Sequence, residues 1–537
     1  MAHNGSDDTV TLTIDGQEVT VPKGTTLLQA AEGMGVRVPH YCYHPGLSAP
    51  AQCRLCLVDV EGAPKPAPSC ITQAQDGQVV HTQGDEAKRM REGVLEFYLL
   101  NHPLDCPICD QSGECELQDY TFAEGRKHGR SVEPKRVFGR DDFGGDVLFY
   151  GDRCVMCTRC VRFMNEVAED PKLTVVERGE RSIIDTFFEE GLNDSPFHGN
   201  IVDICPVGAL VSKDFLHKAR AWDLDHTPSI CPNCSQGCNI ELHTRDNLVQ
   251  RLKPRGNLDV NGYWMCDYGR HRYEWINHGE RLEAPVVRTE EGRMAVGWQD
   301  ALGSLLERLE NAPEGQVQAV ASPFLSNEDL SGLADLVDAL GGGRKVFRSK
   351  QAEDEVALPG FPTLARRRDL CPNRQGAEIL GFQRVGTDAG TGGLEDVAGH
   401  GGVVITMGDD LSDQDASFGE KADLYVHLGA HGTVAAEKAD FVLPITTFAD
   451  GEGTFTNHQG RVQRFWPALN PPGAARPAWL VLGALAARLG QSDAPTAAPE
   501  AFQGAAQRAQ EFQGLTYEAI GSRGALVNEP VRVAGGG

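Results

Sequence analysis

The first residues of the chain alternate between hydrophobic and polar side chains in a way that predicts a hairpin. Residues 10–14 and 18–21 each have the two-residue period of a half-buried strand, and Asp15-Gly16 between them is a typical turn dipeptide. Residues 25–35 then suit a short helix with a threonine at its N-cap and a glycine at its end. This pattern predicts a small mixed sheet with one helix, followed by a loop.

The next two segments predict a helix and a connector. Residues 85–100 suit a helix with its apolar residues on one side. Residues 121–149 are rich in charged residues and glycine. We expect this second segment to join domains and to have little hydrophobic core of its own.

The second half of the chain has a different pattern. Short apolar segments that suit buried strands alternate with segments that suit helices and loops, and the strands are expected at residues 317–321, 345–347, 403–407 and 424–428. Asn327 can cap a helix that runs to Leu340. This alternation predicts an α/β domain, in which helices cover both faces of a parallel sheet.

The cysteines change the picture of the first half. The chain of 537 residues has 16 Cys, of which fifteen fall between Cys42 and Cys266 and the other is Cys371. The N-terminus has no basic region followed by an apolar run, so we expect no secretion signal and a reducing compartment. Reduced thiols close together in a sequence indicate metal ligands. The longest mostly apolar window near the end, residues 479–489, is too short to span a bilayer.

The charge balance excludes one class of function. The chain has 76 acidic and 50 basic residues, which gives a formal net charge of −26. This excess argues against binding to the phosphate backbone of a nucleic acid as the main activity. Solubility explains it, and so does a salt-rich cell interior. Lysine is scarce after Lys350, where only Lys421 and Lys438 follow, and this scarcity fits the second explanation.

The first group of cysteines, hereafter the Cys42 set, follows the predicted small sheet. Ten, two and thirteen residues separate its members, which are Cys42, Cys53, Cys56 and Cys70. The two-residue gap allows neighbouring thiolates to hold the same iron, and the outer cysteines complete a four-thiolate site for a 2Fe–2S centre. The long first gap differs from the plant-type ferredoxin pattern. A structural zinc site is the alternative.

The second group, hereafter the His102 set, lies in the stretch NHPLDCPICDQSGEC. It contains one imidazole and three thiols within a short loop, at His102, Cys106, Cys109 and Cys115. Pro103 and Pro107 prevent a helix there, and Gly113 adds backbone freedom. Four such ligands can converge on one inorganic centre. A 4Fe–4S cluster and a zinc ion with one His and three Cys both fit.

The third group, hereafter the Cys154 set, has the most specific spacing. Its first three members form C-x2-C-x2-C and the fourth comes 45 positions later, giving Cys154, Cys157, Cys160 and Cys205. Three cysteines at this spacing can wrap one face of a cubane, and a proline after the fourth, here Pro206, belongs to the bacterial ferredoxin pattern. We assign all four to one 4Fe–4S centre, with zinc as the alternative.

The fourth group, hereafter the Cys231 set, has the spacing C-x2-C-x3-C with a fourth cysteine 28 positions later. Its members are Cys231, Cys234, Cys238 and Cys266. Strands predicted at 240–243 and 248–252, about a turn at 245–247, would form a small sheet under this site. This set is also expected to hold a 4Fe–4S centre. The four sets use fifteen cysteines and leave only Cys371.

These motifs resemble those of one known family. NHPLDCPICDQSGEC, RCVMCTRCVRF and DICPVGAL are similar to the cluster motifs of the large iron–sulfur subunit of bacterial NADH-quinone oxidoreductase, respiratory complex I. The resemblance covers about residues 8–270 and includes four ligand sets in the order of the family. It implies one 2Fe–2S and three 4Fe–4S clusters, the last of which resembles an additional cluster found in some bacterial members and lying off the main electron path.

The resemblance also implies a domain order. We expect α+β ferredoxin-like iron–sulfur domains, beginning with a β-grasp 2Fe–2S domain, and then an α/β domain like that of molybdopterin oxidoreductases. FVLPITTFADGEGTFTNHQGRVQRF, residues 441–465, resembles a piece of that fold, which implies ancestry rather than bound molybdenum. The expected boundaries are 8–84 for the 2Fe–2S domain, 85–135 for the His102 set, 136–222 for the Cys154 set, 223–279 for the Cys231 set, 280–490 for the truncated α/β domain, and 491–537 for a C-terminal tail.

The function implied by this resemblance is electron transfer. Single electrons would come from the flavin- and NADH-binding subunit of complex I, pass through the clusters, and leave to other iron–sulfur subunits toward the quinone site. The chain would be peripheral on the cytoplasmic face of the bacterial inner membrane and would meet the membrane only through the assembled complex. It lacks a nucleophile with its base and a glycine-rich cradle for flavin or nicotinamide, so we expect no hydride-transfer site.

Two other functions share some of these features. A molybdenum-dependent formate dehydrogenase would need a cysteine or selenocysteine at its metal, and only Cys371 is available after Cys266. Cys371 stands in RRRDLCPNRQGAEILGF, which is more similar to a stretch of the large iron–sulfur subunit of complex I than to a catalytic loop. A diaphorase subunit of a soluble NAD-reducing hydrogenase shares the first three ligand sets, but the long α/β half counts against it. Gly408-Asp409-Asp410 after a predicted strand is a weak nucleotide signal without a full glycine-rich fingerprint.

Overall fold

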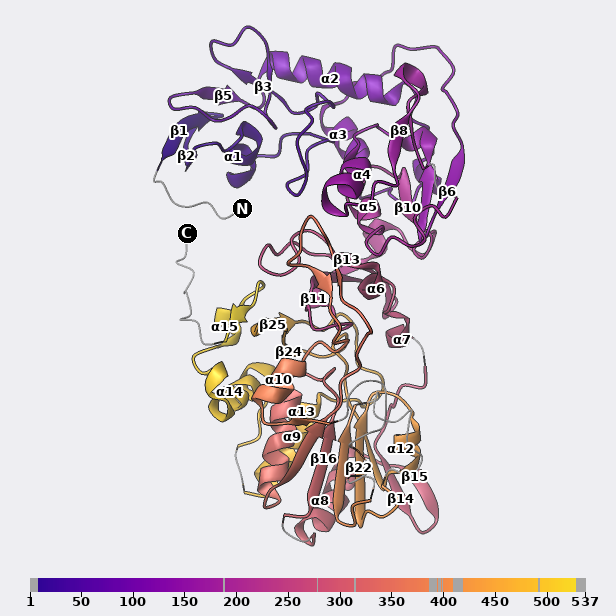
Figure 1. Cartoon of the computed structure of the whole chain (residues 1–537), viewed down its shortest axis with the longest axis vertical. Coiled ribbons are helices and arrows are strands. Elements are labelled where there is room, and N and C mark those ends of the chain that lie inside the picture. Colours follow the sequence, from indigo (N-terminus) through magenta and orange to yellow (C-terminus); the bar gives the residue numbers. More distant parts are fainter. Residues whose placement is uncertain are drawn as a thin grey trace. The chain divides into compact units, whose positions relative to one another are not determined.

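A computed structural model describes residues 8–186, 189–277, 279–312, 315–385, 394, 397, 399–408, 419–490 and 493–527. The chain divides into two compact units, of which the first extends to Asp223 and includes Leu358–Gly360, and the second contains the remaining residues. Figure 1 shows the elements of each unit. Each unit is described by itself.

The first unit begins with a five-stranded sheet and one helix. Its elements are β1 (Thr9–Ile14), β2 (Gln17–Pro22), α1 (Leu27–Gly33), β3 (Leu57–Val60), β4 (Ala67–Pro68) and β5 (Val79–His81). The strand order is β2-β1-β5-β3-β4, with β1 antiparallel to β2 and parallel to β5. Leu12, Ile14, Leu27 and Leu28 form its core, and Thr26 caps α1 with a capping box. The predicted hairpin and helix are therefore confirmed.

Short elements make up the rest of the first unit. They are α2 (Asp85–Leu99), η1 (Cys106–Ile108), α3 (Glu116–Glu124), β6 (Arg140–Gly144), β7 (Val147–Tyr150), η2 (Gly151–Arg153), α4 (Arg159–Arg162), η3 (Phe163–Val167), β8 (Thr174–Val176), η4 (Gly179–Arg181), β9 (Ile183–Asp185), α5 (Asn200–Asp203), β10 (Leu210–Ser212) and η5 (Ala221–Asp223). The helix predicted at 85–100 is confirmed as α2.

The prediction of a connector at 121–149 is wrong for its last part. The strands β6 and β7 form an antiparallel hairpin, and β10 adds to it from later in the chain. Phe143 and Phe149 are buried there and stack with ring centroids 4.8 Å apart. Because β6 is short and mostly exposed, its sequence has little of the alternation that predicts a strand.

The second unit begins with the small sheet that carries the Cys231 set and also contains a second small sheet. The first consists of β11 (Asp225–Ile230), β12 (Asn239–Arg245) and β13 (Leu248–Pro254), followed by α6 (Asp267–Arg270) and α7 (Glu274–Asn277). The second consists of β24 (Gly453–Thr456), β25 (Arg461–Phe465) and β26 (Ala525–Leu526), next to α15 (Tyr517–Ile520). The strands predicted on either side of the turn at 245–247 are confirmed.

An eight-stranded sheet dominates the second unit. Its strands are β14 (Val286–Thr289), β15 (Gly292–Ala295), β16 (Val317–Ala321), β17 (Gly343–Phe347), β20 (Gln383–Arg384), β21 (Val403–Met407), β22 (Leu424–Gly429) and β23 (Phe441–Pro444). The order is β15-β14-β23-β22-β21-β16-β17-β20, and the six strands from β23 to β20 are parallel. The predicted parallel sheet is confirmed, with an antiparallel pair added at one edge.

Helices cover both faces of this sheet, as the apolar strands require. The elements not yet named are α8 (Trp298–Glu310), α9 (Asn327–Ala339), β18 (Val356–Ala357), β19 (Ala365–Arg366), α10 (Arg374–Ile379), α12 (Val434–Lys438), α13 (Ala478–Arg488), α14 (Ala498–Arg508) and η7 (Gln510–Phe512). The helices α8, α9, α13 and α14 share one core with Val317, Ala319 and Ala321 of β16. Val320 of the same strand faces a second core with α12. Figure 1 shows α9 and α13 side by side along the sheet.

The N-cap of α9 is Ser326 and not Asn327 as predicted. The Ser326 hydroxyl accepts a hydrogen bond from the backbone N–H of Asp329, and the Asp329 carboxylate accepts one from the Ser326 backbone. Asn327 is the first helical residue, and its buried amide donates to Thr454 and Thr456. Both residue types suit an N-cap, so the choice between them was made by the packing of β24.

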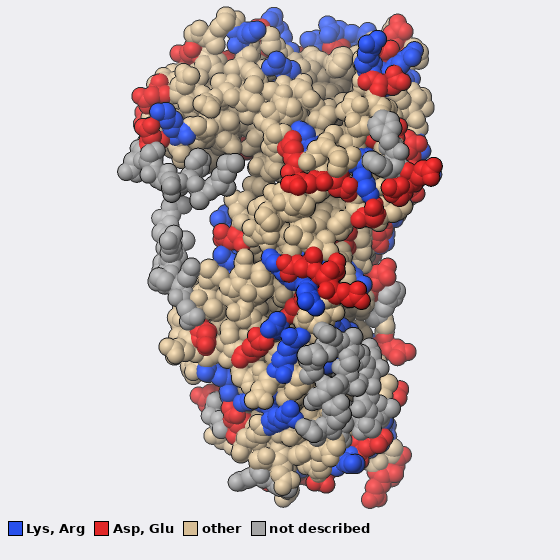
Figure 2. Space-filling view, in the orientation of Figure 1, with Lys and Arg blue, Asp and Glu red and all other residues tan. Residues whose placement is uncertain are grey.

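Charge and membrane propensity add little to this architecture. On the face drawn in Figure 2, acidic and basic side chains are interspersed among larger areas of other residues. The acidic excess is thus not gathered into one patch on that face. Among the helices that the structure describes, none combines the length and the apolar character needed to cross a bilayer.

A buried carboxyl on α9 makes a pH-dependent contribution to stability. Glu328 accepts hydrogen bonds from the backbone N–H and hydroxyl of Thr454, at 2.8 and 2.9 Å, and from the Tyr517 hydroxyl at 2.8 Å. Burial raises the pKa of Glu328 from 4.5 to about 7. Between these values the folded protein keeps a proton that the unfolded chain loses, so the folded state loses stability as the pH rises.

We therefore expect stability to fall by roughly 3 kcal/mol as the pH rises from about 4.5 to about 7, because each pKa unit corresponds to about 1.4 kcal/mol. Glu328→Gln should remove this part of the pH dependence, as measured by urea titrations across the range. Glu518→Gln changes an exposed side chain on α15 and should leave the slope unchanged. An unaltered slope in Glu328→Gln would contradict the prediction.

Candidate metal centres

The structure brings the four thiols of the Cys42 set together in the loops around β3. All four residues are buried. The thiols of Cys53 and Cys70 hydrogen-bond to that of Cys42, and this holds the pKa of the Cys42 thiol far below its usual range. The hydrogen bond to Cys42, and a further one to Cys56, raise the pKa of Cys70. The thiols are thus close enough to share one centre.

Local backbone geometry explains why distant members of the Cys42 set meet. Arg54, between Cys53 and Cys56, has a positive φ of 56°, which turns the chain sharply between the two thiols. Ser69 donates from both its backbone N–H and its hydroxyl to the carbonyl oxygen of Cys56, at 2.9 and 2.8 Å. These two bonds hold Cys70, the next residue, beside Cys56.

The His102 set surrounds the turn η1. Cys109 and Cys115 are buried, and Cys106 is exposed. Burial lowers the pKa of His102 to about 4, so its imidazole is neutral at pH 7. Its Nδ1 atom is buried without a hydrogen-bond partner among the described residues. A neutral imidazole with an unsatisfied ring nitrogen is the form that binds a metal.

Two features close the space around the His102 set. The side chains of Arg153 and Asp105 pair at 2.6 Å, and their charges act on both His102 and Cys109. A Cβ atom on Gly208 would lie only 2.2 Å from the sulfur of Cys109. Only glycine therefore fits at position 208 without displacing that thiol.

The Cys154 set lines one small cavity. All four sulfur-bearing residues contribute to its wall, together with Arg159, Pro206 and apolar side chains such as Phe149. Met156 and Thr158, the residues between successive cysteines, have positive φ values of 51° and 58°. Two such turns in five residues wrap the C-x2-C-x2-C loop so that its thiols face the same point.

The charges within the Cys154 set repel one another when the thiols ionise. Burial raises the pKa of Cys160 well above its usual range, and the neighbouring Cys157, Cys154 and Cys205 raise it further. Burial also raises the pKa of Cys157, to about 12. Thiolates in this position need a cation among them, and iron would supply it.

The Cys231 set is fully buried beside the β11–β13 sheet. Burial raises the pKa of Cys238, and the thiols of Cys231, Cys234 and Cys266 add to that effect because all three lie close to it. The Asn233 side chain lies 3.8 Å from the Cys231 sulfur, and the Gly269 N–H points at the Cys266 sulfur at 3.4 Å. Such N–H groups stabilise thiolate ligands.

Gly269 has a second role at this set. A Cβ atom at this position would lie 2.9 Å from the Cys231 sulfur and 3.6 Å from that of Cys266. The backbone of α6 therefore approaches both sulfurs as closely as glycine allows. The strands, the helix and the loop together form a cradle whose shape is set by the ligands.

Arginines between the ligand sets are functional candidates that the sequence analysis did not identify. Arg159 on α4 donates to the carbonyl oxygens of Tyr43, at 2.7 Å, and Ile204, at 3.1 Å. Arg162 on the same helix donates to the carbonyl oxygens of Cys42 and Cys157. The signal was present in RCVMCTRCVRF, where arginines alternate with the cysteines.

The donor sets fit iron–sulfur clusters in chemistry and in burial. Each provides four soft or borderline ligands around one point or within one short loop, and His102 has the unsatisfied nitrogen that ligation would use. Such an array can hold several metal centres in fixed positions. Cys371 belongs to none of the four sets and is itself buried.

Comparison with known families agrees with this chemistry. Five family models match, and their descriptions are 2Fe–2S iron–sulfur cluster binding domain (7–85), NADH-ubiquinone oxidoreductase-G iron–sulfur binding region (91–130), NADH-quinone oxidoreductase subunit 3, ferredoxin-like domain (144–211), molybdopterin oxidoreductase Fe4S4 domain (224–278) and molybdopterin oxidoreductase (373–488). The chain therefore has 2Fe–2S and 4Fe–4S binding domains followed by a molybdopterin oxidoreductase domain, in the expected order.

Two relatives match the first part of the chain at high identity. One subunit of the NADH-quinone oxidoreductase of Rickettsia felis is 40% identical over 333 residues, which cover 62% of this chain and 49% of the relative. The mitochondrial NADH dehydrogenase [ubiquinone] iron-sulfur protein 1 of Solanum tuberosum is 44% identical over 336 residues, which cover 62% of this chain and 45% of the relative. The matched part thus spans about half the length of these relatives.

A solved structure matches part of the chain as well. A chain from the crystal structure of NAD+-reducing [NiFe]-hydrogenase in the H2-reduced state has 31% sequence identity and a TM-score of 0.36, and the match covers 39% of this chain and 90% of that one.

A longer match decides the family. The mitochondrial NADH-ubiquinone oxidoreductase 78 kDa subunit of Candida albicans is 31% identical over 595 aligned positions, which cover 89% of this chain and 82% of the relative. At that coverage both the cluster-binding region and the α/β region are included. The chain therefore belongs to the family of the large iron–sulfur subunit of NADH-quinone oxidoreductase and its mitochondrial counterparts.

Proposed function

We propose that the chain is an electron-transfer subunit of NADH:quinone oxidoreductase, complex I, and relays single electrons from the flavin subunit toward the quinone site. The observation that carries the proposal is the presence of three buried ligand sets within one compact unit. The residues next to them in sequence contact the same arginines. The named relatives support the same function.

We assign the ligands as the spacing suggests. The Cys42 set would hold one 2Fe–2S cluster, and the His102, Cys154 and Cys231 sets would each hold one 4Fe–4S cluster. When bound, such clusters supply reversible one-electron chemistry. No molybdenum is expected. The domain boundaries proposed from the sequence, with the α/β domain at 280–490, place one ligand set in each of the first four domains.

The chain's own residues would set the properties of each centre. Buried cysteines exclude water from the ligands, and the N–H groups of Asn233 and Gly269 point at sulfurs of the Cys231 set. Arg153 places a buried positive charge beside the His102 set. The number of N–H donors, the burial and the ligand type tune the potential of a cluster. His102 is the clearest such difference among the four sets.

We propose that the partners are the flavin- and NADH-binding subunit and other iron–sulfur subunits of the complex. The chain would be peripheral, on the cytoplasmic face of the bacterial inner membrane, and would have no site for hydride transfer. The described residues include no nucleic-acid-binding motif that would argue for another partner class.

Metal analysis of the anaerobically purified chain tests this function. We expect about 14 iron and about 14 sulfide per chain, without molybdenum or stoichiometric zinc. Low-temperature EPR of the reduced protein should give one binuclear and three cubane signals. A colourless, sulfide-free protein loaded with zinc would refute the proposal. Bound molybdenum together with formate oxidation would establish the formate dehydrogenase alternative instead.

A second prediction concerns His102. His102→Cys replaces a neutral imidazole with a thiolate, so the centre gains one negative charge and its reduced form becomes less stable. We expect the cluster to be retained and its potential to fall by on the order of 100 mV. A redox titration followed by EPR measures this shift.

The matched control for this titration is His128→Cys. It makes the same chemical change at an exposed residue outside the four sets and should leave every potential unchanged. Equal potentials in wild-type protein and His102→Cys would argue that His102 is not a ligand.

A further inference from the structure

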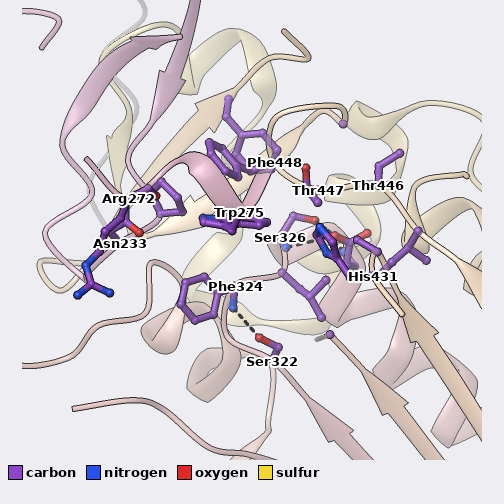
Figure 3. Close-up of a pocket in the computed structure, with 18 of the residues that line it drawn as sticks. Asn233, Arg272, Trp275, Ser322, Phe324, Ser326, His431, Thr446, Thr447 and Phe448 are labelled. Atoms are coloured by element: carbon purple, nitrogen blue, oxygen red, sulfur yellow. Dashed lines mark hydrogen bonds between the residues drawn. The ribbon is translucent and has the colours of Figure 1, made fainter. Parts of the chain in front are cut away.

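The second unit contains a large cavity that electron transfer does not require. Its volume is about 660 Å³, within the range typical of small-molecule sites. The residues that directly follow four parallel strands line it, namely Ser322 after β16, Gly408 after β21, Ala430 after β22 and Ile445 after β23. Figure 3 shows Ser322, His431 and Thr446 around this space. The cavity therefore lies at the carboxyl ends of the sheet.

The sheet topology makes this position a binding site in many α/β proteins. The chain passes from β16 to β17 on one side, and β21 later pairs with the other side of β16. The strand order thus reverses between β16 and β21, and ligands of open α/β sheets bind outside the carboxyl ends at such a switch point. Ser322 and Gly408 mark that point in the cavity wall. Asp409 and Asp410, which follow Gly408 in the motif noted above, lie outside the described residues.

Aromatic side chains from three separate segments line the cavity. They are Trp275 on α7, Phe324 before α9 and Phe448 after β23. Figure 3 shows these three rings gathered around the same space, and the centroids of Trp275 and Phe448 are 6.1 Å apart. Trp275 is 38% exposed although it is large and apolar. An accessible aromatic face inside a cavity suits a planar ring of a ligand.

The polar groups of the cavity favour an anion. Two lining acids are already engaged, since Glu452 pairs with Arg464, and Asp329 accepts hydrogen bonds in the cap of α9 and from the backbone of Trp479. Lys350 and Arg272 also line the cavity, and their two positive charges face one further carboxylate, Glu274. The described lining residues thus provide more unengaged positive than negative charge.

One buried donor lacks an acceptor. The indole Nε1–H of Trp479 has no hydrogen-bond partner among the described residues, and Trp479 is only 7% exposed. Tryptophan N–H groups usually have a partner when they are buried. Because Trp479 lines the cavity, a ligand acceptor would satisfy it.

From these observations we propose that the cavity binds a mononucleotide, a planar heteroaromatic ring joined to a phosphate. The ring stacks on Trp275, the phosphate lies toward Lys350 and Arg272, and an oxygen or ring nitrogen accepts from Trp479. This site is independent of the iron–sulfur clusters, so its failure would leave the electron-transfer function untouched.

Isothermal titration of the full chain with AMP tests the proposal. Adenosine, which lacks the phosphate, and ribose 5-phosphate, which lacks the ring, separate the two halves of the ligand. We expect AMP to bind and each half-ligand to bind at least tenfold more weakly. Absence of binding by AMP and GMP at millimolar concentration would overturn the proposal, and ribose 5-phosphate binding as tightly as AMP would overturn the stacking site.

Variants locate the binding. Trp275→Leu should lose tenfold or more in affinity for AMP, because base stacking on an aromatic side chain contributes roughly 1–3 kcal/mol. Trp479→Phe keeps the ring but loses the donor, and should lose severalfold. Trp222→Leu makes the matched change at a residue that is 65% exposed in the first unit and should have no effect. Unchanged affinity in both cavity variants would place any binding elsewhere.

A second inference rests on the proposed function and on a different observation, the contacts of Arg159. Its guanidinium donates to the carbonyl oxygen of Tyr43, to that of Ile204, and to the Glu116 carboxylate at 3.3 Å. These residues are direct neighbours of Cys42, Cys205 and Cys115 in the sequence. The side chain is only 6% exposed. One buried cation thus touches the backbone or side chains beside three ligand sets.

We infer that Arg159 is a positioning residue that holds these three sets together and raises their potentials through its charge. A positive charge close to a cluster favours the reduced form, and burial keeps this effect from being screened by water. Arg159→Met should therefore lower the potentials of three centres together. Arg159→Lys keeps the charge and should restore most of the shift while losing some of the hydrogen bonds.

Iron content, measured first, separates this inference from the proposed function. Redox titration with EPR then measures the potentials in wild-type protein, in both Arg159 variants and in Arg89→Met, which removes an exposed arginine and should change nothing. If Arg159→Met does not retain iron, Arg159→Lys still tests the charge, because its potentials should stay near those of the wild type. Full iron content with unchanged potentials in Arg159→Met, or potentials in Arg159→Lys that fall far from the wild type, would overturn the role of the charge.

Discussion

Closely packed buried thiols are the constraint on which this structure depends. Each thiol in the Cys154 and Cys231 sets lies among other thiols and away from water, and both effects disfavour the thiolate. An array of this kind is unfavourable unless cations lie within it, and metal binding then becomes part of the free energy of folding. The loops around these sets have few other means of holding their shape, since they contain turns, short helices and positive φ angles instead of long regular elements.

The two units meet this constraint in different ways. In the first unit, apart from the core under α1, the ligand sets are surrounded by buried arginines whose guanidinium groups donate to backbone carbonyls. Those arginines bring positive charge to the thiols and also connect loops that are distant in the sequence. In the second unit the Cys231 set lies beside a sheet, and a large apolar core on both faces of the parallel sheet provides independent stability.

The α/β unit keeps the features of a binding fold although electron transfer gives it no ligand to bind. Parallel strands end at a cavity, the strand order reverses there, and a buried indole N–H points to a missing acceptor. Relationship to the molybdopterin oxidoreductases accounts for the topology, but a fold does not specify a ligand. The side chains that line the cavity carry that information.

The sequence by itself determined the ligand residues, their grouping and the type of most elements. Spacings such as C-x2-C-x2-C act over a few residues, where the chain has little freedom, and the two-residue and buried-strand periods are equally local. The hairpin β1–β2, the helix α2 and the parallel strands β16, β21 and β22 were predictable for this reason.

Only the tertiary structure decided which distant groups meet. Ser326 caps α9 because the amide of Asn327 is used by β24, and residues 140–149 form a sheet because β10 arrives from later in the chain. Arg159 reaches three ligand sets, and Gly208 lies against Cys109, through contacts between segments more than forty residues apart. No local period records such contacts, because they depend on the packing of the whole unit rather than on the conformation of any one segment.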